Sequence, residues 1–272
     1  MSEVTAPQSP LRDRLTAAWP HVIRWGGAIL GALIIFGALV AFKGANPVEV
    51  YADMWTSTFA RPRSLTEIFV RMAPIALAAL AVVVPAKAGM INVGGEGQIL
   101  LGAIAAAGIA LLTDQSMPGT VVVALMVVAG MLAGAAWAGI AGLLRIAFNV
   151  NEAVTTLLLN FIALDLLLFL IYQPWRESAA AQPATRELAG AAKLPTLWAT
   201  GVHVGIVFAV VAVAVLGWLL ARTRWGFRLT VVGGNSEAAR RSAMPVTALL
   251  LSALLVGGAL AGLAGMIEFA GV

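Results

Sequence analysis

The sequence contains no cysteine, so it can form neither a disulfide nor a thiolate metal site. Charge is scarce as well: 11% of the 272 residues are Asp, Glu, Lys or Arg, against roughly 25% in an average soluble domain. A chain so poor in charge cannot cover a water-facing surface, and its 61% of hydrophobic residues indicate a lipid environment. The net charge of +4 is typical of membrane orientation and lipid contact, so we predict no nucleic-acid partner.

The motifs of common catalytic machinery are also missing. There is no G-x-x-x-x-G-K-S/T phosphate loop, so the chain is not expected to bind ATP by that device. Neither H-E-x-x-H nor G-x-S-x-G occurs, and the two histidines lie far apart in the sequence. We therefore predict a non-enzymatic protein without a metal or cofactor.

Seven apolar runs are long enough to suggest membrane helices, which need about 20 residues to cross the hydrocarbon core. They cover residues 25–42, 65–86, 98–112, 121–144, 154–172, 198–221 and 246–267. The runs lack the alternation of transmembrane strands. We predict an all-α polytopic membrane protein of about seven helices. Small residues four apart, such as Gly130 with Gly134 and Gly258 with Gly262, would let these helices approach closely.

The distribution of Lys and Arg favours a cytoplasmic N-terminus, because basic residues concentrate in the inner loops of membrane proteins. The densest basic stretch lies between residues 222 and 241 and determines this assignment. The predicted organisation is a cytoplasmic tail at 1–20, a transmembrane domain at 21–272, external loops at 43–64 and 173–197, and a cytoplasmic loop at 222–245.

The first polar segment, residues 89–98 (GMINVGGEGQ), separates the second and third apolar runs. Its candidate site residues are Asn92, Gly94, Gly95, Glu96, Gly97 and Gln98. Glycines disfavour a helix, and irregular backbone at membrane depth is tolerated only inside protein or beside a water-filled cavity. One interpretation is a broken or re-entrant segment beside a substrate path. The other is an ordinary cytoplasmic loop in which Glu96 caps the third span.

A second polar group surrounds the start of the fifth span. Asn149, Asn151 and Glu152 can cap this helix. Asn160 lies deeper and shares a helix face with Thr156, four residues earlier. Asn151, Glu152 and Asn160 are candidates for the substrate path, although for Asn160 we favour hydrogen bonding that holds neighbouring helices together.

The third polar segment predicts a short cytoplasmic helix between the last two spans. Asn235 or Ser236 can cap its start, Glu237 falls in its first turn, and Arg240 and Arg241 lie at its end. Such a helix is suited to dock in a groove of a soluble partner and to transmit movement. A basic loop that only fixes the topology is the alternative.

Together, residues 89–98, 151–160 and 226–240 resemble the permeases of bacterial ABC importers, within the branched-chain amino acid and simple-sugar permease superfamily. The form Asn-Val-Gly-Gly-Glu-Gly-Gln is most similar to the nucleoside-type branch. The resemblance implies a multi-pass protein of the bacterial plasma membrane. It also implies cytoplasmic ATPase subunits, a second permease subunit and an external substrate-binding lipoprotein as partners.

By the same resemblance, the ATPase-coupling residues are expected to be Gly234, Asn235, Glu237, Ala238, Ala239 and Arg240. The expected function is import of a nucleoside or related sugar-like solute, driven by ATP hydrolysis in a partner subunit. Two features depart from the family pattern. Ala243 stands where glycine is usual, and the chain ends at Val272 where such permeases continue, so a truncated permease domain is expected.

Two other functions fit parts of the sequence. An ion-coupled secondary transporter or channel would need ionisable groups in the membrane, and Glu96, Asp165 and Glu268 are the candidates. A non-transporting remnant would fit the early end of the chain. Co-purification with an ATPase subunit favours the importer, whereas uptake driven by protons or sodium favours the secondary transporter.

Overall fold

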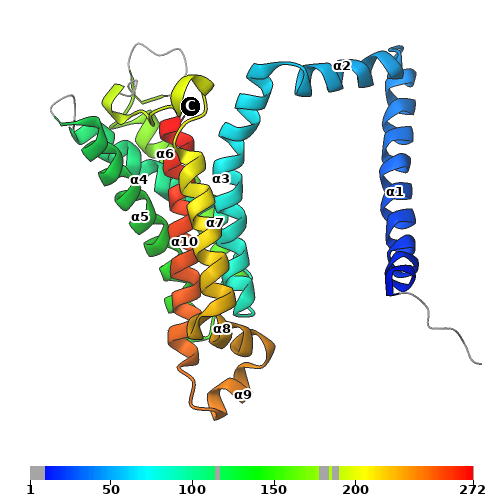
Figure 1. Ribbon diagram of the computed structural model, residues 1–272. Helices are drawn as coiled ribbons and strands as arrows, with labels where there is room; N and C mark the ends of the chain where they lie inside the picture. Colours follow the sequence, from blue (N-terminus) through cyan, green and yellow to red (C-terminus); the bar gives the residue numbers. More distant parts are fainter. Residues whose placement is uncertain (1–9, 114–116, 178–183, 186–189, 272) are drawn as a thin grey trace, which may run out of the picture. The chain divides into compact units, whose positions relative to one another are not determined.

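The computed structural model describes residues 10–113, 117–177, 184–185 and 190–271, which fold into helices joined by short irregular segments (Figure 1). Seven of the described helices are long and apolar enough to cross a membrane, as the sequence predicts. The chain divides into two units, residues 1–65 and 66–272, each with its own internal contacts.

The first unit contains α1 (Pro10–Phe42) and α2 (Pro47–Phe59). The first span lies within α1, which begins inside the predicted tail at 1–20; residues 1–9 of that tail are outside the described part. The predicted external loop at 43–64 contains α2, a helix that the hydropathy pattern did not predict.

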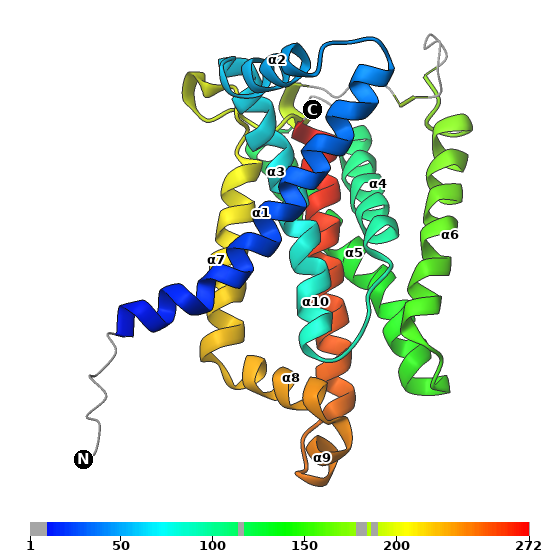
Figure 2. The same cartoon turned by 90° about the vertical axis from the view of Figure 1, so that its right-hand side faces the viewer.

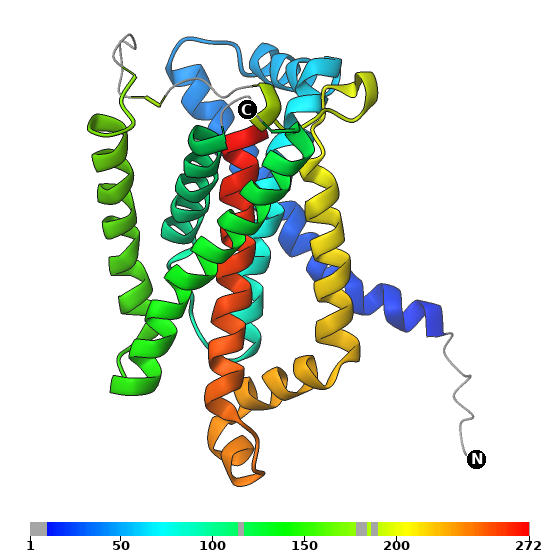
Figure 3. The same cartoon turned by 90° about the vertical axis from the view of Figure 1, so that its left-hand side faces the viewer.

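The second unit is a bundle built around α10 (Val246–Gly271), its most buried helix. This unit also holds α3 (Pro62–Lys87, whose first turn belongs to the first unit), α4 (Gly95–Thr113), α5 (Gly119–Phe148), α6 (Glu152–Tyr172) and α7 (Gly205–Arg222). The closest packing joins α10 to α4 and α5, which lie beside it in Figure 3. α6 contacts α4 and α5.

Glycines make this packing possible, because the backbones of neighbouring helices touch where side chains are absent. A Cβ atom added to Gly262 would collide with the carbonyl oxygen of Gly130, and one added to Gly258 with that of Gly134. The two small-residue pairs predicted from the sequence therefore pack against one another, from α5 onto α10.

The sixth span was predicted to begin at residue 198, and this is wrong: α7 begins at Gly205. The apolar residues before it form a folded segment, in which Trp198–Thr200 is a 3-10 turn and Gly201 follows with φ +75°. The N–H of Leu194 donates to the carbonyl of Ala270 at 2.9 Å, which fastens the segment to the end of α10. Apolar composition alone does not distinguish such a segment from a span.

Two further helices connect α7 to α10 at the end of the bundle opposite the C-terminus of α10 (Figure 2). These are α8 (Arg224–Gly234), which Thr223 caps by accepting from the N–H of Gly226 at 3.3 Å, and α9 (Ser236–Arg241). The predicted cytoplasmic loop at 222–245 is therefore mostly helical.

Candidate functional site

The predicted break between the second and third spans is present, because α3 ends at Lys87 and α4 begins only at Gly95. The residues between are irregular, and Gly89 adopts φ +75°, a conformation that favours glycine. In Figure 2 this connection climbs along the bundle from the end of α3 to the start of α4. We call residues 88–94 the climbing segment.

Two amide side chains stabilise this segment from within. The Nδ2 group of Asn92 donates to Oε1 of Gln98 at 3.0 Å, and Nε2 of Gln98 donates back to Oδ1 of Asn92 at 2.9 Å. Asn92 also donates to the carbonyl of Ala81 at 3.3 Å and accepts from the N–H of Gly94 at 3.1 Å. Both amides are buried and bonded to protein, so their structural role is to hold the turn closed.

A row of polar side chains on the neighbouring helix α6 forms hydrogen bonds with the backbone of the climbing segment. Glu152, Thr156 and Asn160 are spaced four residues apart, so they lie on one helix face. The N–H of Ile91 donates to Oε1 of Glu152 at 3.3 Å, and the N–H of Val93 donates to the hydroxyl of Thr156 at 3.2 Å. We call these three side chains the α6 ladder.

Asn160 completes the ladder with two bonds. Its Nδ2 group donates to the carbonyl of Val93 at 3.0 Å, and its Oδ1 accepts from the N–H of Gly97 at 2.8 Å. Backbone groups of the climbing segment and of the first turn of α4 are thereby paired by side chains of one helix. Of the two interpretations of Asn160, the geometry supports the hydrogen-bonded one.

An arginine that the sequence analysis did not single out anchors the ladder. Arg145, in the last turn of α5, forms an ion pair with Glu152 across the connection to α6. Its position seven residues before Glu152, at the end of a span, is a signal that the sequence offered. Asn151 caps α6 by accepting from the N–H of Ala153 at 2.9 Å.

The glycines of this motif differ in their surroundings. A Cβ atom at Gly94 would lie 2.8 Å from Cβ of Thr156, and one at Gly97 would lie 3.0 Å from Cα of Asn160. Gly95 faces open space, and Glu96 is exposed in the first turn of α4, where its charge suits the helix dipole. The close contact of α6 with the climbing segment therefore requires Gly94, and its close contact with α4 requires Gly97.

The second region of interest is the corner between α8 and α9. Oδ1 of Asn235 accepts from the N–H of Ala238 at 2.9 Å, so the predicted cap of the short helix is present. Glu237 pairs with Arg241 at 3.1 Å and with Arg240 at 3.7 Å, and all three side chains are exposed. Ala239 alone on α9 is buried, with no exposed surface. The charged side chains of α9 are thus exposed to solvent, and the helix packs on the bundle through the methyl group of Ala239.

The corner also touches the end of α3. A Cβ atom at Gly233 would collide with the carbonyl oxygen of Lys87 and would lie 3.0 Å from the nitrogen of Gly89, whereas Gly234 faces open space. Gly233, which the sequence analysis did not single out, makes this contact with α3, whereas Gly234, predicted to couple to the ATPase, does not. A glycine pair alone does not reveal which member needs to be small.

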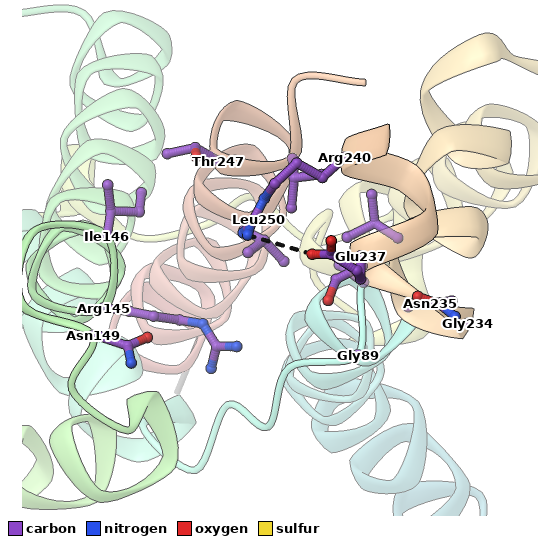
Figure 4. A pocket seen from close by; sticks show the side chains of 15 residues that line it. Gly89, Arg145, Ile146, Asn149, Gly234, Asn235, Glu237, Arg240, Thr247 and Leu250 are labelled. Atoms are coloured by element: carbon purple, nitrogen blue, oxygen red, sulfur yellow. Dashed lines mark ion pairs between the residues drawn. The ribbon is translucent and has the colours of Figure 1, made fainter. Parts of the chain in front are cut away.

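A hollow of about 600 Å³ lies between this corner and the neighbouring ends of α5 and α10 (Figure 4). Arg145 and Asn149 line it from the α5 side, and Thr247 lines it from α10. The ion pair of Glu237 with Arg240 stands on the opposite side in Figure 4. The climbing segment, the anchor of the α6 ladder and α9 therefore meet around one polar opening.

The turn after α9 contains the departure noted in the sequence. Ala243 adopts φ +55°, in the left-handed region that residues with a Cβ atom rarely occupy. Its N–H donates to the carbonyl of Arg240 at 3.0 Å, which ends the short helix. A glycine, which the resemblance predicted at this position, would adopt this conformation without strain.

The ionisable candidates for ion coupling do not gather in one place. Glu96 lies at the start of α4, Asp165 is exposed on α6, and Glu268 lies near the end of α10. Glu268 faces a hollow of about 300 Å³ that Arg71 of α3 also lines. Burial lowers the pKa of His203, which lies just before α7, and the negative charge of Glu268 opposes this shift.

Comparisons with known proteins identify the family of the chain. Residues 64–272 match the family described as branched-chain amino acid transport system / permease component. A glucose ABC transporter permease protein of Haloferax volcanii is 39% identical over 254 residues, which cover 89% of this chain and 66% of that protein. A nucleoside ABC transporter permease protein of Lactococcus lactis is 30% identical over 250 residues, covering 89% and 67%.

A guanosine ABC transporter permease protein of Bacillus subtilis is 28% identical over 248 residues, which cover 89% of this chain and 68% of that protein. The chain spans about two thirds of the length of these curated relatives. No solved structure matches the chain significantly.

Proposed function

This chain belongs to the family of branched-chain amino acid transport system permease components, and from that premise we propose that it is the membrane-spanning subunit of an ATP-binding-cassette importer. The chemical energy would come from cytoplasmic ATPase subunits. A second permease subunit and an external substrate-binding lipoprotein would complete the transporter in the bacterial plasma membrane, with the N-terminus of this chain in the cytoplasm.

The proposed solute is a nucleoside or a related sugar-like molecule. The relatives described above are named as permeases for glucose, nucleosides and guanosine, all of which are neutral polar molecules that are or contain a sugar. The polar groups around the climbing segment are mostly amides, hydroxyls and backbone groups, and the charge of Glu152 is paired with Arg145. Such surroundings suit an uncharged solute better than a highly charged one.

The observation that carries the proposal is the construction of α9. Its charged side chains, Glu237, Arg240 and Arg241, are exposed for a soluble partner, while Ala239 is buried against the bundle. The carbonyl of Ala239 accepts from the N–H of Met244 at 3.1 Å, close to the start of α10. A push on α9 would therefore reach α10 directly, and would reach the end of α3 through Gly233.

We assign five of the six predicted coupling residues, which are exposed at this corner, to contact with the ATPase. The sixth, Ala239, is buried and seats α9 on the bundle. The predicted substrate-path residues of the climbing segment and the α6 ladder would shape the path of the solute. Asn92 and Gln98 would not contact the solute themselves, because their amides are already bonded to each other. Closure of the ATPase would move α9 and α10, and would thereby alternate access at the segment that the α6 ladder holds.

The test uses the permease reconstituted in proteoliposomes with its ATPase and binding protein. Ala239→Asp places a charge at the buried seat of α9, and Ala147→Asp places the same charge at an exposed position on α5 near the same end of the bundle. We expect Ala239→Asp to insert into the membrane but to lose solute uptake and solute-stimulated ATP hydrolysis. Ala147→Asp should keep both activities.

Two results would contradict the proposal. One is normal ATP-driven uptake by Ala239→Asp, which would remove the coupling role of α9. The other is uptake by the wild-type protein that needs no ATPase and follows a proton or sodium gradient, which would favour the ion-coupled alternative.

A further inference from the structure

The short helix α2, absent from the sequence prediction, has two different faces. Its apolar side chains recur at positions that share one face of a helix: Val48, Tyr51, Ala52, Trp55 and Phe59. Other positions carry Glu49, Asp53, Thr56 and Ser57, together with the apolar Val50 and Met54. Trp55 and Phe59 pack on one another along the apolar stripe, with ring centroids 4.6 Å apart.

The apolar stripe is largely uncovered within the described part of the chain. Val48 is 74% exposed, Trp55 66% and Phe59 54%, and no residue of α2 is buried. Three large apolar side chains in one row on a 13-residue helix are costly to leave in water, so another apolar surface is expected to cover them.

Tyr51 establishes which way the stripe points. Its hydroxyl donates to the carbonyl of Leu33 on α1, and its ring lies 5.8 Å from the ring of Phe36. Leu33 precedes the end of α1 at Phe42 by nine residues, or roughly 14 Å at 1.5 Å per residue. The face of α2 that carries Tyr51 therefore points back along the membrane-spanning part of α1, toward the bilayer.

The chain on both sides of α2 keeps it at the membrane surface. α1 ends at Phe42, four residues before α2 begins with its cap at Asn46, and α3 begins at Pro62 soon after α2 ends. Since α1 and α3 both contain candidate spans, neither end of α2 can move far from the surface. Lys43 and Arg61 flank the helix, and long basic side chains at such positions can reach headgroup phosphates.

From these observations we infer that α2 is an interfacial helix, which lies flat in the membrane surface at the outer end of α1 with its Val48–Tyr51–Trp55–Phe59 stripe among the lipid chains. Amphipathic helices of this kind sink their apolar face about 5–10 Å into the boundary between headgroups and acyl chains. Trp and Tyr are the residues that prefer this depth. The inference depends on α1 and α3 crossing the membrane, and it is independent of the transport function.

The absence of cysteine makes the test direct, because single cysteines can be spin-labelled without a background. Labels are placed on the stripe with Val48→Cys and Trp55→Cys, and off the stripe with Glu49→Cys and Asp53→Cys. Ile35→Cys, at an exposed position within the span of α1, provides the lipid-facing reference. Each full-length variant is reconstituted in vesicles that contain anionic lipid, and collisions with oxygen and with a water-soluble nickel chelate are compared.

We expect the labels at positions 48 and 55 to collide with oxygen as the reference does and to be shielded from nickel. The labels at 49 and 53 should be reached by nickel. Nickel access to both stripe positions would overturn the inference, because the stripe would then lie in water. Shielding of the stripe from both reagents would also overturn it, because protein, either a second copy or an external partner, would then cover the helix. Trp55→Cys removes a stripe residue and could itself weaken the attachment of α2 to the membrane. Val48→Cys keeps both Trp55 and Phe59, so its label tests the inference without that loss.

Discussion

The hydroxyl of Thr156 on α6 accepts a hydrogen bond from the backbone N–H of Val93 at 3.2 Å, across 63 residues of sequence. The preceding residue, Thr155, instead donates its hydroxyl to the carbonyl of Asn151, the residue that caps the same helix, at 3.0 Å. The hydroxyls of these two adjacent threonines thus differ in whether they hold the climbing segment, and Thr156 is also the more buried of the two.

Replacing these threonines with valine, which has nearly the same shape, isolates that bond. Thr156→Val leaves the N–H of Val93 unpaired, and we expect a loss of about 1–3 kcal/mol in stability. Thr155→Val should change stability by no more than about 0.5 kcal/mol. Thermal unfolding in detergent measures both. Equal effects of the two substitutions would show that the α6 ladder does not hold the segment.

A second pair of substitutions tests the packing of α10 on α5. Gly262→Ala would place a methyl group against the carbonyl of Gly130, so we expect a loss of about 1–3 kcal/mol or more from overpacking. Gly217→Ala in α7 adds the same methyl group in open space and should gain up to about 1 kcal/mol from helix propensity. Retention of the wild-type unfolding temperature by Gly262→Ala would contradict the close approach.

At the strained turn after α9, unlike at Thr156 and Gly262, we expect a substitution to raise the stability of the protein. Ala243→Gly relieves a left-handed conformation that costs a residue with a Cβ atom roughly 1–2 kcal/mol, so stability should rise by about 1 kcal/mol. Ala238→Gly, within the helical part of α9, should lower stability by about 1 kcal/mol. The unfolding temperatures of the two variants should therefore move apart. A lower value for both would argue against the left-handed turn.

The burial of His203 leads us to expect that the folded protein loses stability below neutral pH. Its Nδ1 atom accepts from the N–H of Gly205 at 3.1 Å, and burial lowers its pKa, so the folded protein favours the neutral ring. The unfolded chain then binds the proton first, and stability should begin to fall as the pH drops below about 6.5. Glu268 reduces the effect because its negative charge raises the pKa of His203.

The matched variant is His203→Asn, whose side-chain oxygen can accept from Gly205 but does not titrate. Comparison of its unfolding temperature with that of the wild type between pH 7.5 and roughly pH 5 separates His203 from the carboxylates. The wild type should lose more stability over this interval. A parallel pH dependence of the two proteins would exclude the proposed effect of His203.

The spans and the family were accessible from the sequence because each rests on a strong local signal. Long apolar runs predict membrane helices by length alone, and the number of seven is confirmed among the described helices. The resemblance to branched-chain and sugar permeases depended on three ordered motifs and is confirmed by the family match. The start of α7 was predicted seven residues too early, because an apolar segment folded against α10 has the same composition as a span.

The contacts of the site were less accessible, since they join distant parts of the chain. The four-residue spacing predicted that Thr156 and Asn160 share a face, but nothing in the sequence indicated that their partners lie at Val93 and Gly97. α2 escaped prediction because its 13 residues are too few to cross a membrane, and the sequence was searched for long apolar runs. An amphipathic search at helical periodicity would have found it.

The account rests on α9 facing the cytoplasm, where an ATPase subunit can bind it. Ala238→Cys introduces the single thiol of the chain at an exposed position of α9, next to the charged side chains. A membrane-impermeant maleimide should label this thiol in inside-out vesicles and not in right-side-out vesicles, and bound ATPase subunit should block the labelling. Labelling from the external side, or labelling in inside-out vesicles that saturating ATPase subunit leaves unchanged, would contradict the account.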